Sequence, residues 1–223
     1  MVEYANEILE SQIIEEFCKS FVNKLNQYKL SYYIRNKTDN ISSENAIHAS
    51  IIWTRQAVSQ INQLIIINKN LNIEDLIVLI SYIDILLEAT EQVYRVLYKT
   101  KKYPDFMQDE FCFCDIPEEY SKLNNRRYFK EIRALFSAHP VNITSPCGKS
   151  RFADIPMPRC RFFKIANLKG DFNVRLWTAT RDDQDTIHFP LYVDDLIRYS
   201  RILYNRYERY NKRLIDIVKK NVE

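Results

Sequence analysis

The chain has 223 residues, of which 46% are hydrophobic and 27% charged, a composition typical of a globular protein rather than a disordered one. Its two glycines, Gly148 and Gly170, lie far apart, which excludes a P-loop and a glycine-rich dinucleotide-binding loop. The acidic N-terminus predicts no secretory signal, and the most apolar stretch, residues 76–87, is too short to span a membrane. Since that stretch is short, we expect no membrane partner. Five cysteines require no disulfide, so we expect a cytoplasmic protein with reduced thiols.

The net charge of +3 is unevenly distributed along the chain. Residues 1–122 carry 12 basic and 18 acidic side chains, whereas residues 123–223 carry 20 basic and 11 acidic ones. A basic half on a nearly neutral protein favours a polyanionic partner such as RNA. The alternative is a dipolar surface that helps subunits or an acidic partner to dock.

Apolar residues at steps of three and four predict three long helices in the first half of the chain. The first covers residues 4–34. The second begins near Ser42 or Ser43, either of which is a good N-cap, and runs to about residue 68. The third begins at Asn72, whose following acids suit the first turn of a helix, and continues to about residue 101.

The second half is predicted to mix shorter elements. A helix over about 121–138 ends before Pro140, because a residue preceding proline disfavours helical geometry. Residues 140–160 contain four prolines and are expected to form a loop. Strands are then predicted over 162–168 and 172–180 around a turn at residues 169–171, with a further short strand over 186–189. The last helix is predicted over 193–220.

Long helices with short connections favour a mainly α fold, an up-and-down helical bundle with a small β-hairpin inserted before the C-terminal helix. We expect one domain over residues 1–223. The bundle would comprise about 1–139 plus 193–223. The loop and hairpin at 140–192 would be the insertion.

One short stretch suggests chemistry: Arg133 and His139, separated by five residues at the end of the fourth predicted helix. Histidine exchanges protons near neutral pH, and arginine holds a phosphate with two parallel hydrogen bonds. Together they could cleave RNA without a metal or cofactor. The imidazole would move the proton of the attacking 2′-hydroxyl, and the guanidinium would stabilise charge on the phosphorane. Alternatively, Arg133 pairs with an acid and His139 caps the helix C-terminus.

A helical bundle in which one helix ends with Arg, a few residues and then His resembles the HEPN superfamily, whose members include toxin and antiphage ribonucleases. The family's Arg and His correspond to Arg133 and His139. The resemblance covers the helical part of the chain. It implies a homodimer in which two Arg–His helices form a composite site, cleavage that leaves a cyclic phosphate, and often a neighbouring antitoxin protein.

Neighbouring residues extend this candidate site. Upstream of Arg133, four side chains are candidates for contacting RNA phosphates: Arg126, Arg127, Tyr128 and Lys130. The alternative is a solvated basic face. Ser137 could assist by hydrogen bonding. A second match to the motif, Arg181 to His188, falls in the predicted hairpin and therefore in the wrong structural context.

The final helix offers another nucleic-acid candidate, because tyrosines interleave with its many arginines and could stack on single-stranded bases. Its tyrosines are Tyr199, Tyr204, Tyr207 and Tyr210. However, Tyr207 and Tyr210 also belong to a seam at four-three spacing that predicts packing. A zinc site would have to use scattered ligands, Cys112, Cys114, Cys147 and Cys160 with His139 or His188, so we expect no metal.

The sequence therefore predicts a metal-independent endoribonuclease of the toxin–antitoxin or phage-defence type. The main alternative is a non-catalytic helical module that binds nucleic acid or protein. A third is an assembly protein whose final helix forms a coiled seam.

Overall fold

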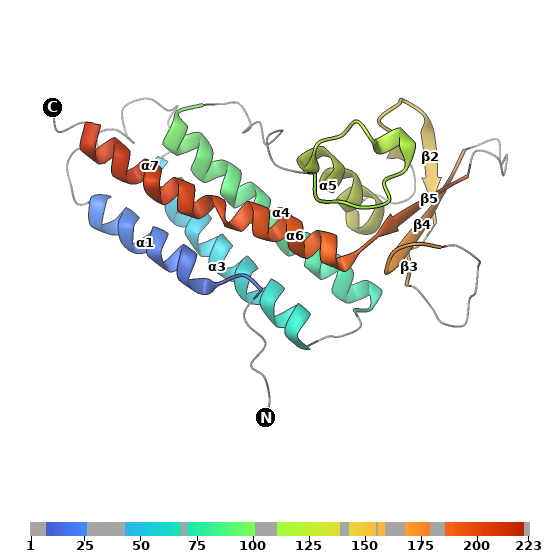
Figure 1. Ribbon diagram of the computed structural model, residues 1–223, viewed down its shortest axis with the longest axis horizontal. Coiled ribbons are helices and arrows are strands. Elements are labelled where there is room, and N and C mark those ends of the chain that lie inside the picture. The colour runs from blue at the N-terminus through green and yellow to red at the C-terminus, as the bar shows by residue number, and fades with distance from the viewer. Residues whose placement is uncertain are drawn as a thin grey trace. The chain divides into compact units, whose positions relative to one another are not determined.

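The structure is a computed structural model, and it describes residues 8–25, 43–67, 71–100, 111–138, 143–154, 156–158, 168–178 and 186–220. Most of the described residues are helical, and a small antiparallel sheet precedes the last two helices (Figure 1). This confirms the mainly α fold class and the position of the β-structure. No helix among the described ranges is long and apolar enough to cross a membrane.

The helices largely follow the predicted ones. They are α1 (Ser11–Leu25), α3 (Ser43–Ile67), α4 (Ile73–Tyr98), α5 (Asn125–Arg133), α6 (Val193–Tyr204) and α7 (Arg206–Lys220). The predicted start of the first helix at residue 4 is too early, since residues 8–10 precede α1 without helical structure, and its predicted end falls outside the described residues.

The single long helix predicted over 193–220 is wrong in one respect. The chain breaks at Asn205 between α6 and α7. The Asn205 amide still donates to the Arg201 carbonyl, and the Glu208 amide bonds the Asn205 carbonyl. Asparagine is a poor residue for a helix interior because its side chain competes locally for backbone groups, which fits the interruption at this position.

The described strands are β1 (Ile143–Thr144), β2 (Ser150–Ala153), β3 (Met157–Pro158), β4 (Phe172–Trp177) and β5 (Ile187–Leu191). All pairings are antiparallel, and β4 is the centre: β2 and β3 pair with one edge and β5 with the other. The predicted loop at 140–160 therefore contains three short strands. Each spans two to four residues, too few for a period-two pattern to stand out among prolines.

The turn before β4 forms where expected, at Gly170. Gly170 has a φ of +88°, and a Cβ there would lie 2.9 Å from the Leu191 backbone nitrogen, so only glycine fits. The residue after it, Asp171, donates its amide to the Leu191 carbonyl. β4 pairs along most of its length with β5, which comes later in the chain, whereas residues 162–167 of the predicted first strand lie outside the described ranges, so their pairing with β4 stays a prediction.

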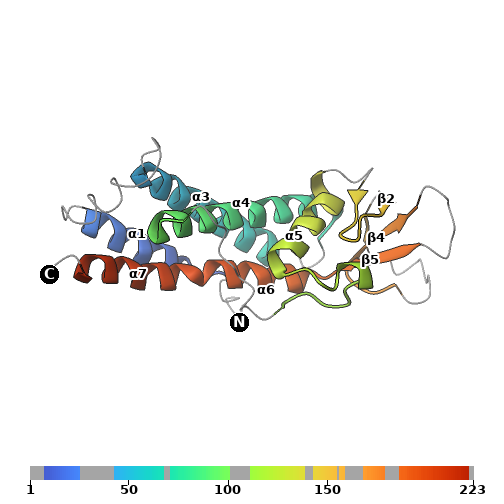
Figure 2. The same ribbon diagram turned by 90° about the horizontal axis from the view of Figure 1, so that it is seen from above.

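The chain divides into two compact units: unit 1 (residues 1–67, 82–105 and 200–223) and unit 2 (68–81 and 106–199). In unit 1, α1, α3, α7 and the later part of α4 lie side by side (Figures 1 and 2). Unit 2 contains α5 and the sheet, so α5 groups with the strands. The organisation as one domain stays a prediction.

Candidate nucleic-acid interface

Helix α5 carries most of the predicted site. Its first turn is capped by Asn124, whose side-chain oxygen accepts a hydrogen bond from the Arg127 amide at 2.9 Å. After Arg133 the chain continues as a π-helical turn, η3 (Ala134–Ala138). Single π-helical turns occur frequently at functional sites.

One face of α5 is buried in an aromatic cluster of unit 2. The Tyr128 ring stacks on Phe189 of β5 at 5.3 Å and meets Phe113 at 4.9 Å. The Phe129 ring lies 5.0 Å from Tyr199. Tyr128 is 1% exposed, so the expectation that it contacts RNA is wrong: a helix of this amphipathic pattern places it on the inner face.

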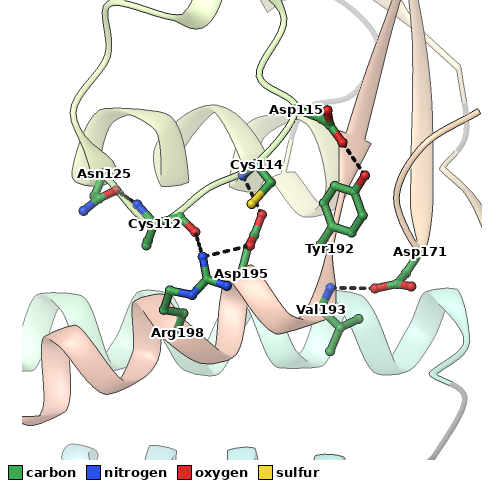
Figure 3. Close-up of polar contacts among 9 residues, drawn as sticks. All are labelled: Cys112, Cys114, Asp115, Asn125, Asp171, Tyr192, Val193, Asp195 and Arg198. Carbon is green, nitrogen blue, oxygen red and sulfur yellow. Dashed lines mark hydrogen bonds and ion pairs between the residues drawn. The ribbon is translucent and has the colours of Figure 1, made fainter. Parts of the chain in front are cut away.

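A segment before α5 ties the helix to α6 (Figure 3). The Asn125 side chain accepts from the Cys112 amide at 2.9 Å, and the Cys112 carbonyl accepts from the Arg198 guanidinium at 3.0 Å. Two residues on, the Cys114 amide donates to Asp195 at 2.8 Å. Burial raises the pKa of the Asp195 carboxyl, and burial raises the pKa of the Cys112 thiol to about 12.

Asp115, the next residue of the segment before α5, makes two further contacts that hold this segment in place. Its carboxylate accepts from the Tyr192 hydroxyl at 2.5 Å and pairs with Lys169 at 2.6 Å. The Lys169 hydrogen bond, followed by that of Tyr192, lowers the pKa of Asp115. Beside it, Asp171 accepts from the Val193 amide at 2.9 Å and so caps the start of α6 (Figure 3). These contacts give α5 a firm support within unit 2.

The opposite face of α5 presents the predicted cations. Arg126, Lys130 and Arg133 are spaced by four and three residues and so share one stripe of the helix. Lys130 and Arg133 are exposed and Arg126 is half-buried, while the exposed Arg127 lies to one side of the stripe. Glu131 is the one acid of α5, and burial raises the pKa of its carboxyl.

Of the two predicted catalytic residues, only Arg133 lies within the described ranges. Arg133 is exposed at the end of α5. Ser137 donates its hydroxyl to the Arg133 carbonyl at 2.9 Å, so this hydroxyl supports the π-helical turn. His139 lies outside the described residues, and its approach to Arg133 stays a prediction.

The second motif match has a different outcome. Arg181 lies outside the described residues, whereas His188 is exposed on β5. The strand register places His188 directly opposite Arg175 of β4. Sequence inspection missed this pair because thirteen positions separate the two residues and no motif links them. Strand alternation alone could have placed Arg175, Trp177 and Asn173 on one face.

The tyrosines of α6 and α7 do not offer stacking surfaces. Exposure is 2% for Tyr199, 1% for Tyr204, 0% for Tyr207 and 3% for Tyr210. The packing seam is thus confirmed in the core of unit 1, and the idea that these rings stack on bases is wrong. The sequence pattern alone did not separate the two readings, because Arg and Tyr alternate around the same helix.

Within the described ranges, no group of three or more His, Cys, Asp or Glu side chains is placed to hold a metal ion. Of the zinc ligands weighed from the sequence, Cys160 and His139 lie outside those ranges. Cys112 is buried and Cys114 is exposed.

Comparisons with protein-family models, with curated proteins and with solved structures found no match to the chain. Any functional conclusion therefore rests on the side chains themselves.

Proposed function

We propose that the chain is an RNA-binding, metal-independent endoribonuclease of the HEPN type, acting in a toxin–antitoxin or phage-defence setting. One observation carries the proposal: Arg126, Lys130 and Arg133 share the outer stripe of α5, whose inner face is anchored in the aromatic cluster. A row of cations on a firmly held helix suits the phosphates of a nucleic-acid strand. The π-helical turn then leads directly to His139.

In the proposed reaction, the RNA 2′-hydroxyl attacks the adjacent phosphorus and His139 accepts its proton. Arg133 stabilises the extra charge on the phosphorane oxygens. The 5′-oxygen of the next nucleotide leaves and takes up the proton from the imidazolium of His139, so the products are a 2′,3′-cyclic phosphate and a 5′-hydroxyl. No metal ion or cofactor takes part in these steps.

We also propose that the helices are arranged up and down, that the protein forms a homodimer, and that it has an antitoxin protein as a partner. Self-association is supported by α3, which exposes four large apolar residues: Ile52, Trp53, Ile66 and Ile67. Between these two pairs the exposed positions carry neutral side chains, apart from Arg55, which pairs with Glu15 at 2.6 Å. A nearly uncharged face can meet its own copy across a two-fold axis without repulsion.

The test is cleavage of single-stranded RNA by purified variants. His139→Ala and Arg133→Ala are each expected to slow cleavage by about a hundredfold or more. The first removes the proton carrier, and the second removes the positive charge that stabilises the phosphorane oxygens. Lys122→Ala, which removes an exposed cation shortly before α5 and outside the candidate site, is the matched control and should stay within a few-fold of the wild type. Unchanged cleavage in both Arg133→Ala and His139→Ala would remove the mechanism.

A non-catalytic nucleic-acid- or protein-binding module is the second candidate, because the cationic stripe of α5 suits phosphates whether or not a proton carrier lies beside it. In that case Lys130→Ala would weaken RNA binding, while wild-type protein would leave the RNA intact. Growth arrest on expression that His139→Ala abolishes would instead favour the nuclease.

A further inference from the structure

The outer face of the β4–β5 ladder gathers side chains suited to a nucleotide. Phe172, Val174 and Leu176 of β4 are at most 2% exposed and form the inner face of the sheet. Alternation therefore places Asn173, Arg175 and Trp177 on the outer face. Directly paired residues of antiparallel strands have Cβ atoms about 4.5–5.5 Å apart, so His188 lies beside Arg175.

Asn173 orients the imidazole of His188. It is 4% exposed, and its amide nitrogen donates to the Lys169 carbonyl at 3.4 Å. Its amide oxygen therefore faces His188 and lies 3.2 Å from Nδ1. Because that oxygen only accepts, Nδ1 carries the hydrogen, and Nε2 of the neutral ring is the acceptor. A buried amide thus sets the tautomer of an exposed histidine.

The guanidinium of Arg175 offers a planar surface for stacking and N–H groups for hydrogen bonding. Its guanidinium lies 5.1 Å from the centre of the Trp177 ring, and its Nε donates to Asp154 at 2.9 Å. A guanidinium has five N–H donors, and among the described residues that of Arg175 donates only to Asp154, which leaves donors for a phosphate. Half of the Arg175 side chain is exposed. Bases stack on both indole rings and guanidinium planes.

We propose that this face of β4 and β5 binds a single-stranded RNA segment, with a base stacked against the Trp177–Arg175 pair and a neighbouring phosphate or ribose held by Arg175 and His188. The proposal rests on the proposed function for its ligand, RNA, and assigns a second contact region apart from α5. The contacts of Arg175 with Trp177 and Asp154 would not by themselves indicate a ligand. The oriented imidazole beside Arg175 presents one acceptor nitrogen, which suits the 2′-hydroxyl of a ribonucleotide.

The experiment uses the only two tryptophans of the chain, Trp53 and Trp177. In the full-length Trp53→Phe protein, all tryptophan fluorescence comes from Trp177. Titration with an eight-nucleotide oligouridylate is expected to quench this fluorescence. An abasic ribose-phosphate oligomer of equal length should quench less, because it has no base to stack.

Affinity, measured by anisotropy of labelled oligouridylate, should fall about fivefold or more in Trp177→Ala and in Arg175→Ala, since stacking contributes about 1–3 kcal/mol per base. His188→Ala should weaken ribo-oligomer binding more than that of the matching deoxy-oligomer. Asp154→Asn should strengthen binding, because it removes a charge that competes for Arg175. Lys122→Ala, which removes an exposed cation elsewhere in unit 2, is the matched control.

The outcomes separate the two proposals. RNA binding that needs Lys130 and Arg133 but leaves Trp177 fluorescence unchanged overturns this site alone. Equal quenching by the abasic oligomer overturns base stacking here. Absence of RNA binding by the wild-type protein overturns both this site and the proposed function.

Discussion

The two compact units treat their buried tyrosines in opposite ways. In unit 1, Tyr204 donates to the Glu10 carbonyl at 2.7 Å, Tyr207 shares a hydrogen bond with Thr54 at 2.6 Å, and Tyr210 donates to the Thr90 carbonyl at 3.1 Å. Successive tyrosines of the last two helices thus bond the segment entering α1, then α3, then α4. In unit 2, the hydroxyls of Tyr120 and Tyr128 are buried without a hydrogen-bond partner among the described residues.

This difference separates two uses of the same side chain. A buried hydroxyl with a partner adds direction to helix packing, whereas one without a partner costs the free energy of its desolvation. Unit 1 therefore gains specificity from its tyrosines. Unit 2 uses Tyr120 and Tyr128 for their rings, which contact each other and Phe189 around α5.

The largest effect is expected for Tyr207→Phe, which removes the hydrogen bond to the fully buried Thr54. The free energy of unfolding should fall by about 1–2 kcal/mol, because the threonine hydroxyl loses its partner. Urea denaturation measures the change. Adding Thr54→Val should recover part of the loss, and a single variant as stable as the wild type would contradict the role given to this hydroxyl.

Tyr128→Phe tests the other side of the comparison and should have a smaller effect of opposite sign. The ring contacts are kept and a buried hydroxyl without a described partner is removed, so the protein should be unchanged or up to about 1 kcal/mol more stable. The same denaturation assay applies. A clear loss of stability would show that unit 2 uses its tyrosine hydroxyls as unit 1 does.

The smallest effect concerns pH and Asp195 of unit 2. Burial raises the pKa of this carboxyl above its ordinary value of 3.8. At a pH between 3.8 and the raised pKa, the folded protein therefore holds a proton that the unfolded chain releases. The contribution of Asp195 to stability is therefore present at low pH and lost as the pH rises through the raised pKa. The difference in unfolding free energy, Asp195→Asn minus wild type, should thus increase from pH 4 to pH 7.

Asp216→Asn, an exposed acid on α7, is the control for this pH series. A difference for Asp195→Asn that stays constant with pH, or that decreases, would contradict the buried state of the carboxyl.

Much of the helical architecture was predictable because apolar periodicity is a local signal. The bounds of α3 and α4 agree with prediction within a few residues, since Ser43 and Asn72 are recognisable helix starts. The stripe of Arg126, Lys130 and Arg133 was also readable, because helical spacing fixes which residues share a face. The convergence of Arg133 with His139 stays a prediction.

What the amino-acid order determined by itself was the helix content and the cationic side of α5, both of which follow from spacing within one element. Only the tertiary structure decided that β4 pairs with β5, that the tyrosines of the last two helices point inward, and that Arg175 meets His188 across two strands. These facts depend on contacts between residues distant in the chain. Their geometry is set by strand register and by competition for burial, which no local pattern records.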